Sequence, residues 1–151
     1  MLDDVDLKII GLLTANARAT FSELAEQVGL SGPSTAERVR RLEERRVIRG
    51  YAARVDPEAL GLGLTAFISV TLLGSTDRQG FLEEVVNFHE VVECHHVAGN
   101  DDYLLKVHVS GTRGLESFVS YRLKALQGIE RTHTTVVLST ALERPLSPGK
   151  R

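Results

Sequence analysis

The hydrophobic pattern of this chain changes its period near residue 60. Before that point, apolar residues such as Val5, Ile9 and Leu12 recur every three or four positions, which is the spacing of an amphipathic helix. From Leu64 to Leu72, the apolar residues at even positions alternate with a second set, namely Thr65, Phe67, Ser69 and Thr71. This alternation is the period of a strand. A stretch containing proline and glycine, 56–63, separates the two patterns. The sequence therefore predicts a helical domain at 1–55, a hinge at 56–63, a mixed domain at 64–142 and a tail at 143–151.

The first 50 residues predict three short helices. Thr20 and Glu23 have the spacing of a capping box, which starts the second helix, and Gly29 is a residue type that ends one. A third helix can begin at Ser31, because Pro33 is tolerated in a first turn whose amides have no helical partner. Only Gly29-Leu30-Ser31 separates the second and third helices, and this spacing is typical of a helix-turn-helix. The partly β-branched segment 47–55 that follows predicts a small β wing.

Beyond the hinge, the pattern predicts strands at 64–72, 91–98, 103–110 and 129–138. Helices are predicted at 74–88 and around 115–126, from apolar residues at helical spacing. The resulting order is β-α-β-β-α-β, which is the ferredoxin-like arrangement. The fold class predicted for the whole chain is α+β, with an N-terminal winged helix-turn-helix and a C-terminal ferredoxin-like domain.

Charge is distributed unevenly along a chain whose net charge is −2. Residues 30–54 hold seven arginines and three glutamates, so this segment carries +4 and the rest of the chain −6. A basic segment of this kind is an electrostatic footprint for nucleic acid even on a mildly acidic protein. The third helix therefore becomes the candidate that enters the major groove of duplex DNA.

With Thr35, Val39 and Leu42 facing inward, the third helix has one outer face, formed by Ser34, Glu37, Arg38 and Arg41. Arginine can bond guanine and glutamate can accept from cytosine in the major groove. Ser31 stands at the start of this helix, and Arg45, Arg46 and Arg49 are expected to face phosphates. The alternative is a solvated helix with charge pairs at i, i+4. The spacing after the short turn favours DNA binding.

Composition bounds the location of the protein. No apolar run approaches the roughly 20 residues that span a bilayer, and the acidic N-terminus lacks the basic region of a secretory signal. Cys94 is the single cysteine, so an internal disulfide is excluded. We expect a soluble cytoplasmic protein with no membrane partner.

Few residues favour catalysis or metal binding. His95 and His96 are adjacent on a strand and point to opposite faces, whereas Cys94, His96 and His108 could share one face and form a soft metal site. Too few ligands stand at suitable spacing, and Cys94 fits a buried small residue better than a nucleophile. We expect no metal, no cofactor, no catalytic residue and no enzymatic activity.

The loop Gly99-Asn100-Asp101-Asp102-Tyr103 groups backbone amides, two carboxylates and a ring. Such a loop could hold a zwitterion, with amides binding its carboxylate and aspartate binding its ammonium group. The same residue types also suit a simple hairpin turn, and spacing alone favours the turn.

Two segments of the chain, LDDVDLKIIGLLTANARATFSELAEQVGLS and RVRRLEERRVIRGYAARVDPEALG, resemble the Lrp/AsnC (feast/famine) transcriptional regulators. The segments AFISVTL and VAGNDDYLLKVHV are similar to the ligand and assembly domain of that family. The resemblance implies homodimers that assemble to tetramers or octamers, and an amino acid or related metabolite as effector. It places that effector near Gly99, Asp102 and Tyr103, with Thr132 and Thr134 as further contacts, and so favours a ligand site over a bare turn.

The chain departs from the pattern of these relatives at the start of the third helix, within it and just after it. The proline of Ser31-Gly32-Pro33 is displaced by one place, and Glu37 stands where basic or small polar residues are common. Arg46 stands where relatives tend to have glycine, so either the helix ends differently or Arg46 adopts a strained left-handed conformation. The base preference of relatives therefore cannot be transferred to this chain.

These observations predict a sequence-specific DNA-binding regulator whose DNA binding or assembly responds to an amino acid or related metabolite. Two alternatives stay open. One is an architectural DNA-binding protein without an effector, and the other is a small-molecule-binding or enzymatic ferredoxin-like domain with an incidental helical appendage.

Overall fold

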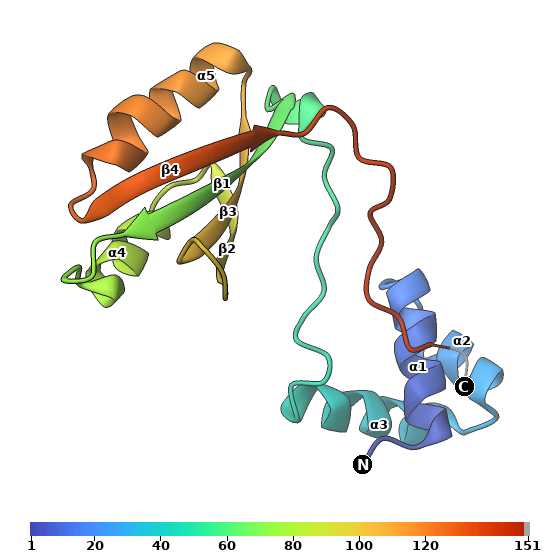
Figure 1. The fold of residues 1–151 in the computed structure, drawn as a ribbon. Coiled ribbons are helices and arrows are strands. Elements are labelled where there is room, and N and C mark those ends of the chain that lie inside the picture. Colours follow the sequence, from blue (N-terminus) through green and yellow to red (C-terminus); the bar gives the residue numbers. More distant parts are fainter. Residues whose placement is uncertain (150–151) are drawn as a thin grey trace. The chain divides into compact units, whose positions relative to one another are not determined.

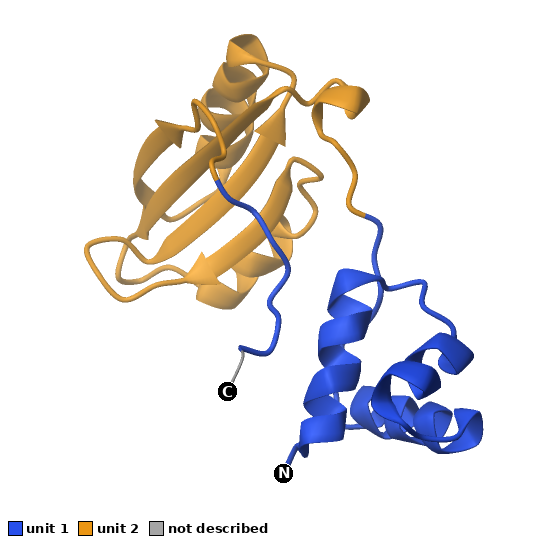
Figure 2. Cartoon of the chain, turned by 90° about the vertical axis from the view of Figure 1, so that its right-hand side faces the viewer, with its two compact units in different colours: residues 1–53, 142–151 blue, residues 54–141 orange. Residues whose placement is uncertain are grey.

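The computed structural model describes residues 1–149, and the chain forms two compact units (Figure 1, Figure 2). Among the described residues, the first unit contains 1–53 and 142–149, and the second contains 54–141. Residues 143–149 of the predicted tail form neither helix nor strand, and its residues 150 and 151 lie outside the described part. Among the described helices, none has both the length and the apolar character that crossing a membrane would require.

The first unit consists of three helices, α1 (Asp4–Ala15), α2 (Phe21–Val28) and α3 (Gly32–Glu44). Their apolar faces meet in a core of Ile9, Leu13, Leu24, Val39 and Leu42. The capping box of Thr20 and Glu23 starts α2 as predicted, and Gly29 ends it in the left-handed conformation. The three-helix arrangement and the short α2–α3 turn confirm the predicted helix-turn-helix.

The predicted β wing is wrong, since residues 47–55 form no strand. The amides of Val47 and Ile48 both donate to the Leu42 carbonyl, at 2.9 and 3.1 Å, so they cap α3 instead of starting a ladder. The remaining residues, 49–55, are exposed. A two-stranded ribbon this short is marginal in water without further packing, so the β-branched pattern alone was insufficient to form a wing.

The second unit begins with the 3₁₀ turn η1 (Glu58–Leu60) and is built on a four-stranded sheet. Its strands are β1 (Leu64–Leu72), β2 (Val91–His96), β3 (Tyr103–Val109) and β4 (Ile129–Val136). The strand order is β2-β3-β1-β4 and every neighbouring pair is antiparallel. This is the topology of the predicted ferredoxin-like domain.

Helical segments cover one face of this sheet (Figure 2). They are α4 (Arg78–Val85) and a continuous run formed by α5 (Thr112–Glu116), the π-helical η2 (Ser117–Arg122) and the 3₁₀ turn η3 (Leu123–Ala125). The core of the unit lies between them and the alternate residues Ala66, Ile68 and Val70 of β1. Within residues 54–141, no helix covers the opposite face of the sheet (Figure 2).

Both helices of the second unit differ in detail from the prediction. The first is shorter than the predicted 74–88, because Asp77 caps it at Gln79 and Gly74-Ser75 lie in the preceding turn. The second changes its winding along its length. The wider π turns place Phe118 and Leu123, which are five residues apart, together in the core.

Candidate DNA-binding and effector-binding sites

The turn before α3 is held by side chains of the helix start. The Ser31 hydroxyl caps the helix, because its oxygen accepts from the Ser34 amide at 3.3 Å, and its O–H donates to the Ser34 hydroxyl at 2.9 Å. The Thr35 hydroxyl donates to the Ser31 carbonyl at 3.0 Å. Ser31 therefore fixes where α3 begins, and Ser34 stands exposed on its first turn.

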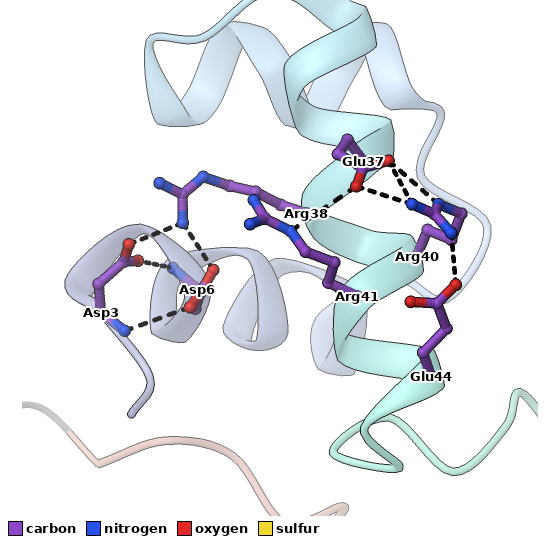
Figure 3. A network of polar contacts seen from close by, with 7 residues as sticks. All are labelled: Asp3, Asp6, Glu37, Arg38, Arg40, Arg41 and Glu44. Carbon is purple, nitrogen blue, oxygen red and sulfur yellow. Dashed lines mark hydrogen bonds and ion pairs between the residues drawn. The ribbon is translucent and has the colours of Figure 1, made fainter.

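The exposed face of α3 carries a chain of ion pairs (Figure 3). Arg40 donates to both oxygens of Glu37, at 2.8 and 2.9 Å, and also contacts Glu44. This hydrogen bonding, together with the nearby positive charges, lowers the pKa of Glu37 from its ordinary value. The Nε of Arg41 lies 3.9 Å from Glu37, and 57% of the Arg41 side chain is exposed. Glu37 is thus a charged acceptor, and Arg41 remains accessible to a partner.

Arg38 does not share this environment. Its side chain is 24% exposed and turns toward the first turn of α1, where it contacts Asp3 and Asp6 (Figure 3). Helical spacing placed Ser34, Glu37, Arg38 and Arg41 on one outer face. The structure brings three of these onto an open surface and places the fourth against another helix.

The end of α3 forms a Schellman motif. The Arg46 amide donates to the Glu43 carbonyl at 2.9 Å, and the Val47 amide donates to the Leu42 carbonyl at 2.9 Å. Arg46 occupies the left-handed position of this motif with φ of 54°. Of the two possibilities that the sequence left open, the structure has the strained one. Arg45, Arg46 and Arg49 are all exposed there, so positive charge gathers at this end of the helix.

The segment after α3 is tied back to that helix. The Tyr51 hydroxyl donates to Glu43 at 2.9 Å. Partial burial and the Glu43 carboxylate raise the pKa of Tyr51 to about 12, so the hydroxyl keeps its proton and remains a donor. No spacing pattern along the chain predicts this contact.

In the second unit, the loop between β2 and β3 packs against the end of β1. One oxygen of the Asp102 carboxylate accepts from the Leu72 amide at 2.8 Å, and the other accepts from Arg78 at 2.7 Å. Arg78 is the first residue of α4, and its guanidinium also lies 3.2 Å from His96. Asp102 is therefore already paired with a cation within the chain.

The neighbouring carboxylate, Asp101, lies on the uncovered face of the sheet. It accepts from the Thr71 hydroxyl at 2.8 Å and faces Arg131 at 3.4 Å. The bond from Thr71, with a contribution from Arg131, lowers the pKa of Asp101 from its ordinary value. Arg131 also approaches the Asn100 carbonyl at 3.4 Å. Asp101 and Asp102 are thus held apart by contacts to different partners.

Tyr103 is buried in a stack of rings. Its centroid lies 5.1 Å from that of Phe81 and 5.2 Å from that of His96. Tyr103 pairs with Val70 of β1, and Val70 also pairs with Thr132 on β4. Thr132 and Thr134 are half-buried and pair with the core-facing Val70 and Ile68 of β1, so they point to the helix-covered side of the sheet, whereas Asp101 lies on the uncovered side.

Sequence reasoning missed Arg78 and Arg131, because each reaches the loop from a strand or helix distant in sequence. It also missed a cavity of about 720 Å³ beside α4. This cavity is lined by Leu73, Ser75, Thr76, Asp77, Gly80, Phe81, Glu84 and the turn 125–128. None of the predicted effector residues lines it.

The residues considered for metal binding or nucleophilic catalysis do not form such sites. Cys94 and His96 pair with core-facing residues of β3, whereas His108 lies on the opposite face and contacts Thr65 at 2.9 Å, so the three do not share a face. Within residues 1–149, no group of three or more histidine, cysteine, aspartate or glutamate residues could hold a metal ion. Burial raises the pKa of the Cys94 thiol, which disfavours the thiolate that a nucleophile requires.

Comparison with known proteins decides the family. Residues 2–43 match the AsnC-type helix-turn-helix domain, and residues 65–147 match the Lrp/AsnC ligand binding domain. The chain belongs to the Lrp/AsnC family. This confirms the resemblance inferred from the sequence, and this Lrp/AsnC-family protein is a DNA-binding transcriptional regulator.

Individual relatives are similar over nearly their full length. The HTH-type transcriptional regulator LrpA of Mycobacterium tuberculosis is 40% identical over 92% of this chain and 91% of its own. The structure of transcriptional regulator NMB0573 of Neisseria meningitidis in complex with L-Met has a TM-score of 0.93 and 34% identity, over 98% of this chain and 97% of that one. The feast or famine regulatory protein of M. tuberculosis complexed with L-methionine has a TM-score of 0.91 and 39% identity, over 98% and 100%.

Proposed function

We propose that this Lrp/AsnC-family regulator reads a specific duplex sequence with α3 and that an amino acid bound by the second unit controls that binding. The observation that carries the proposal is the exposed face of α3. It presents Ser34, Glu37 and Arg41 after a rigid turn and ends in exposed arginines. A helix of this kind fits the major groove, where such side chains can bond base edges.

Arg45, Arg46 and Arg49 are proposed to bind phosphates, which would make affinity fall steeply with salt. Ser31 contributes by fixing the start of α3. The protein acts in the cytoplasm by binding and not by catalysis.

The proposed effector site uses the 99–103 loop, with Thr132 and Thr134. Because Thr132 and Thr134 point to the helix-covered side and Asp101 lies on the uncovered side, a second copy is proposed to complete a site that uses both groups. This supports an assembly of dimers, formed through the uncovered sheet face, into tetramers or octamers. The L-methionine complexes of two relatives make an amino acid the first ligand class to test.

Asp102 is proposed to bind the effector ammonium group, which must then replace Arg78 on the carboxylate. The freed guanidinium of Arg78 could bind the effector carboxylate, since arginine and carboxylate form strong charge-assisted pairs. The Asp102–Arg78 pair therefore occupies the site in the absence of effector. A zwitterion opens it, because the ammonium group takes the place of Arg78 on Asp102 and the carboxylate takes the place of Asp102 on Arg78.

The DNA-binding part is tested by selection from a random duplex library with the wild-type chain. A defined enriched sequence is expected, and Arg41→Ala should abolish the footprint on it without changing oligomer size. Enrichment of no sequence, with cooperative coating of any duplex, would contradict the proposed specificity and favour the architectural alternative.

The effector part is tested by thermal shift with the twenty amino acids, including L-methionine. A ligand that binds only the folded state raises stability by about 2.7 kcal/mol at a hundred times its Kd. Asp102→Asn should abolish the shift, because an amide can still accept from the Leu72 amide but cannot pair with an ammonium group. Glu130→Gln is the matched control, since it removes one carboxylate from an exposed position on β4. A shift that survives in Asp102→Asn would place the site elsewhere.

A further inference from the structure

Arg38 closes a cluster of three charged side chains between α1 and α3 (Figure 3). Its Nη1 donates to Asp3 Oδ2 at 2.7 Å and to Asp6 Oδ1 at 2.8 Å. The two remaining carboxylate oxygens cap α1, because Asp3 Oδ1 accepts from the Asp6 amide at 2.8 Å and Asp6 Oδ2 accepts from the Asp3 amide at 3.2 Å. All four oxygens of the Asp3–Asp6–Arg38 cluster therefore have a donor.

Two of the three side chains of the cluster are more enclosed than the other charged groups of α3, whereas the Asp3 side chain is 53% exposed. The Asp6 side chain is 12% exposed and the Arg38 side chain 24%, whereas the Arg41 side chain is mostly exposed. The bonds also join the first turn of α1 to a helix 32 to 35 residues later in the chain. An ion pair that is partly removed from water, and whose carboxylate oxygens all have donors, is a directional constraint.

We propose that Arg38 is a positioning residue for DNA recognition, which fixes the rotation of α3 on α1 through Asp3 and Asp6 and does not itself contact bases. The proposal rests on DNA reading by α3. The apolar contacts in the core that Ile9 shares with Val39 and Leu42 are less directional than hydrogen bonds, so they constrain the rotation of the two helices less. The hydrogen bonds from Arg38 supply that direction, and thereby aim Ser34, Glu37 and Arg41.

One geometric detail separates positioning from base reading. A single nitrogen of Arg38 serves both aspartates, so one ammonium group can replace it. Bidentate recognition of guanine, by contrast, needs the two-pronged arginine fork, and lysine is not equivalent there. Arg38→Lys should therefore preserve positioning and weaken base reading.

Asp6→Asn gives a second distinction, because the two roles of Arg38 predict opposite changes in DNA affinity. Removal of a carboxylate near DNA raises affinity by electrostatics if Arg38 is a reader that Asp6 merely holds. If Arg38 is a positioning residue, Asp6→Asn breaks the cluster and lowers binding to the selected sequence.

The experiment uses the full chain and two duplexes, namely the sequence that the wild-type protein enriches from a random library and a shuffled version of it. The readout is the ratio of the two affinities, together with the dependence of affinity on salt. Wild-type protein is measured in parallel. Its affinity ratio for the selected and shuffled duplexes tests the proposed function, and the change of this ratio in each variant tests the role of the cluster. Thermal unfolding of each variant checks that the first unit is folded.

We expect Arg38→Gln and Asp6→Asn each to lower the ratio by at least about tenfold, and their combination to be no worse than either alone. Arg38→Lys should stay within about threefold of wild type. The salt slope should be unchanged in all of these, whereas Arg45→Gln, the matched phosphate control, should reduce it by about 1.

Three results would overturn the proposal. The first is a salt slope that falls with Arg38→Gln, which would mean that Arg38 contacts phosphate. The second is loss of the ratio in Arg38→Lys together with a neutral or tighter Asp6→Asn, which would make Arg38 a base reader. The third is an unchanged ratio in Arg38→Gln, which would mean that α3 needs no such constraint.

Discussion

Arg46 combines an unfavourable backbone conformation with a charge suited to DNA. Its φ of 54° lies where a side chain costs about 1 kcal/mol and where glycine has no such cost. Arg46→Gly should therefore stabilise the first unit by about 1 kcal/mol and weaken DNA binding, with a salt slope smaller by about 0.9. Arg46→Ala is the matched control, because it removes the guanidinium and keeps the strain. Denaturant unfolding and salt titration of DNA affinity check both effects. Equal free energies of unfolding for Arg46→Gly and Arg46→Ala would mean that the left-handed conformation costs no stability.

At the scale of the element, the caps of the first unit make its stability depend on pH. The Glu23 side chain accepts from the Thr20 amide and hydroxyl, at 2.6 and 2.9 Å, and these bonds lower its pKa from the ordinary 4.5. A carboxyl whose pKa is lower in the folded state contributes stability above its unfolded value, and this contribution is lost as pH falls through the folded value. The first unit should therefore lose stability below about pH 4.5, and Glu23→Gln should reduce this loss. Glu26→Gln removes a carboxylate from an exposed position on the same helix and should leave the acid loss intact. Urea unfolding at a series of pH values measures both.

The π-helical segment of the second unit forms an ion pair through Arg122. Arg122 contacts Glu90, whose side chain is 13% exposed, and its guanidinium carbon lies 4.9 Å from the Phe88 ring centroid. Removing one partner leaves a charge in a site poor in water, so Arg122→Met should destabilise the unit by about 2 kcal/mol. Adding Glu90→Gln removes that charge and should recover part of the loss in thermal unfolding. A double variant no more stable than Arg122→Met would refute this account.

How far elements could be predicted depended on whether their cause is local. The bounds of β1 agree with the prediction, because the alternation of apolar residues in a half-buried strand can be recognised from consecutive residues alone. The wing failed because two amides that a ladder would use are taken by the end of α3, which the pattern of side chains does not reveal. Spacing along α3 identified the buried residues Thr35, Val39 and Leu42 correctly. It could not indicate that the start of α1 covers Arg38, because a helical period describes one helix and says nothing of its neighbour. The same limit hid Arg78 and Arg131, which reach Asp102 and Asp101 from separate elements.

At the scale of the whole molecule, each unit has its own core, formed by residues around Leu24 in the first and around Leu105 in the second. Two cores without shared residues predict two unfolding transitions, and these should respond to different changes. Thr20→Ala removes the cap of α2 and should lower only the first-unit transition, by about 1 kcal/mol in free energy, whereas Arg122→Met should lower only the second. If the uncovered sheet face joins two copies, the second transition should also rise with protein concentration, because association stabilises only the folded unit. Hydrogen exchange read separately from peptides of residues 1–53 and 64–136 distinguishes the units. One common protection level that both substitutions lower equally would mean that the two cores unfold as one.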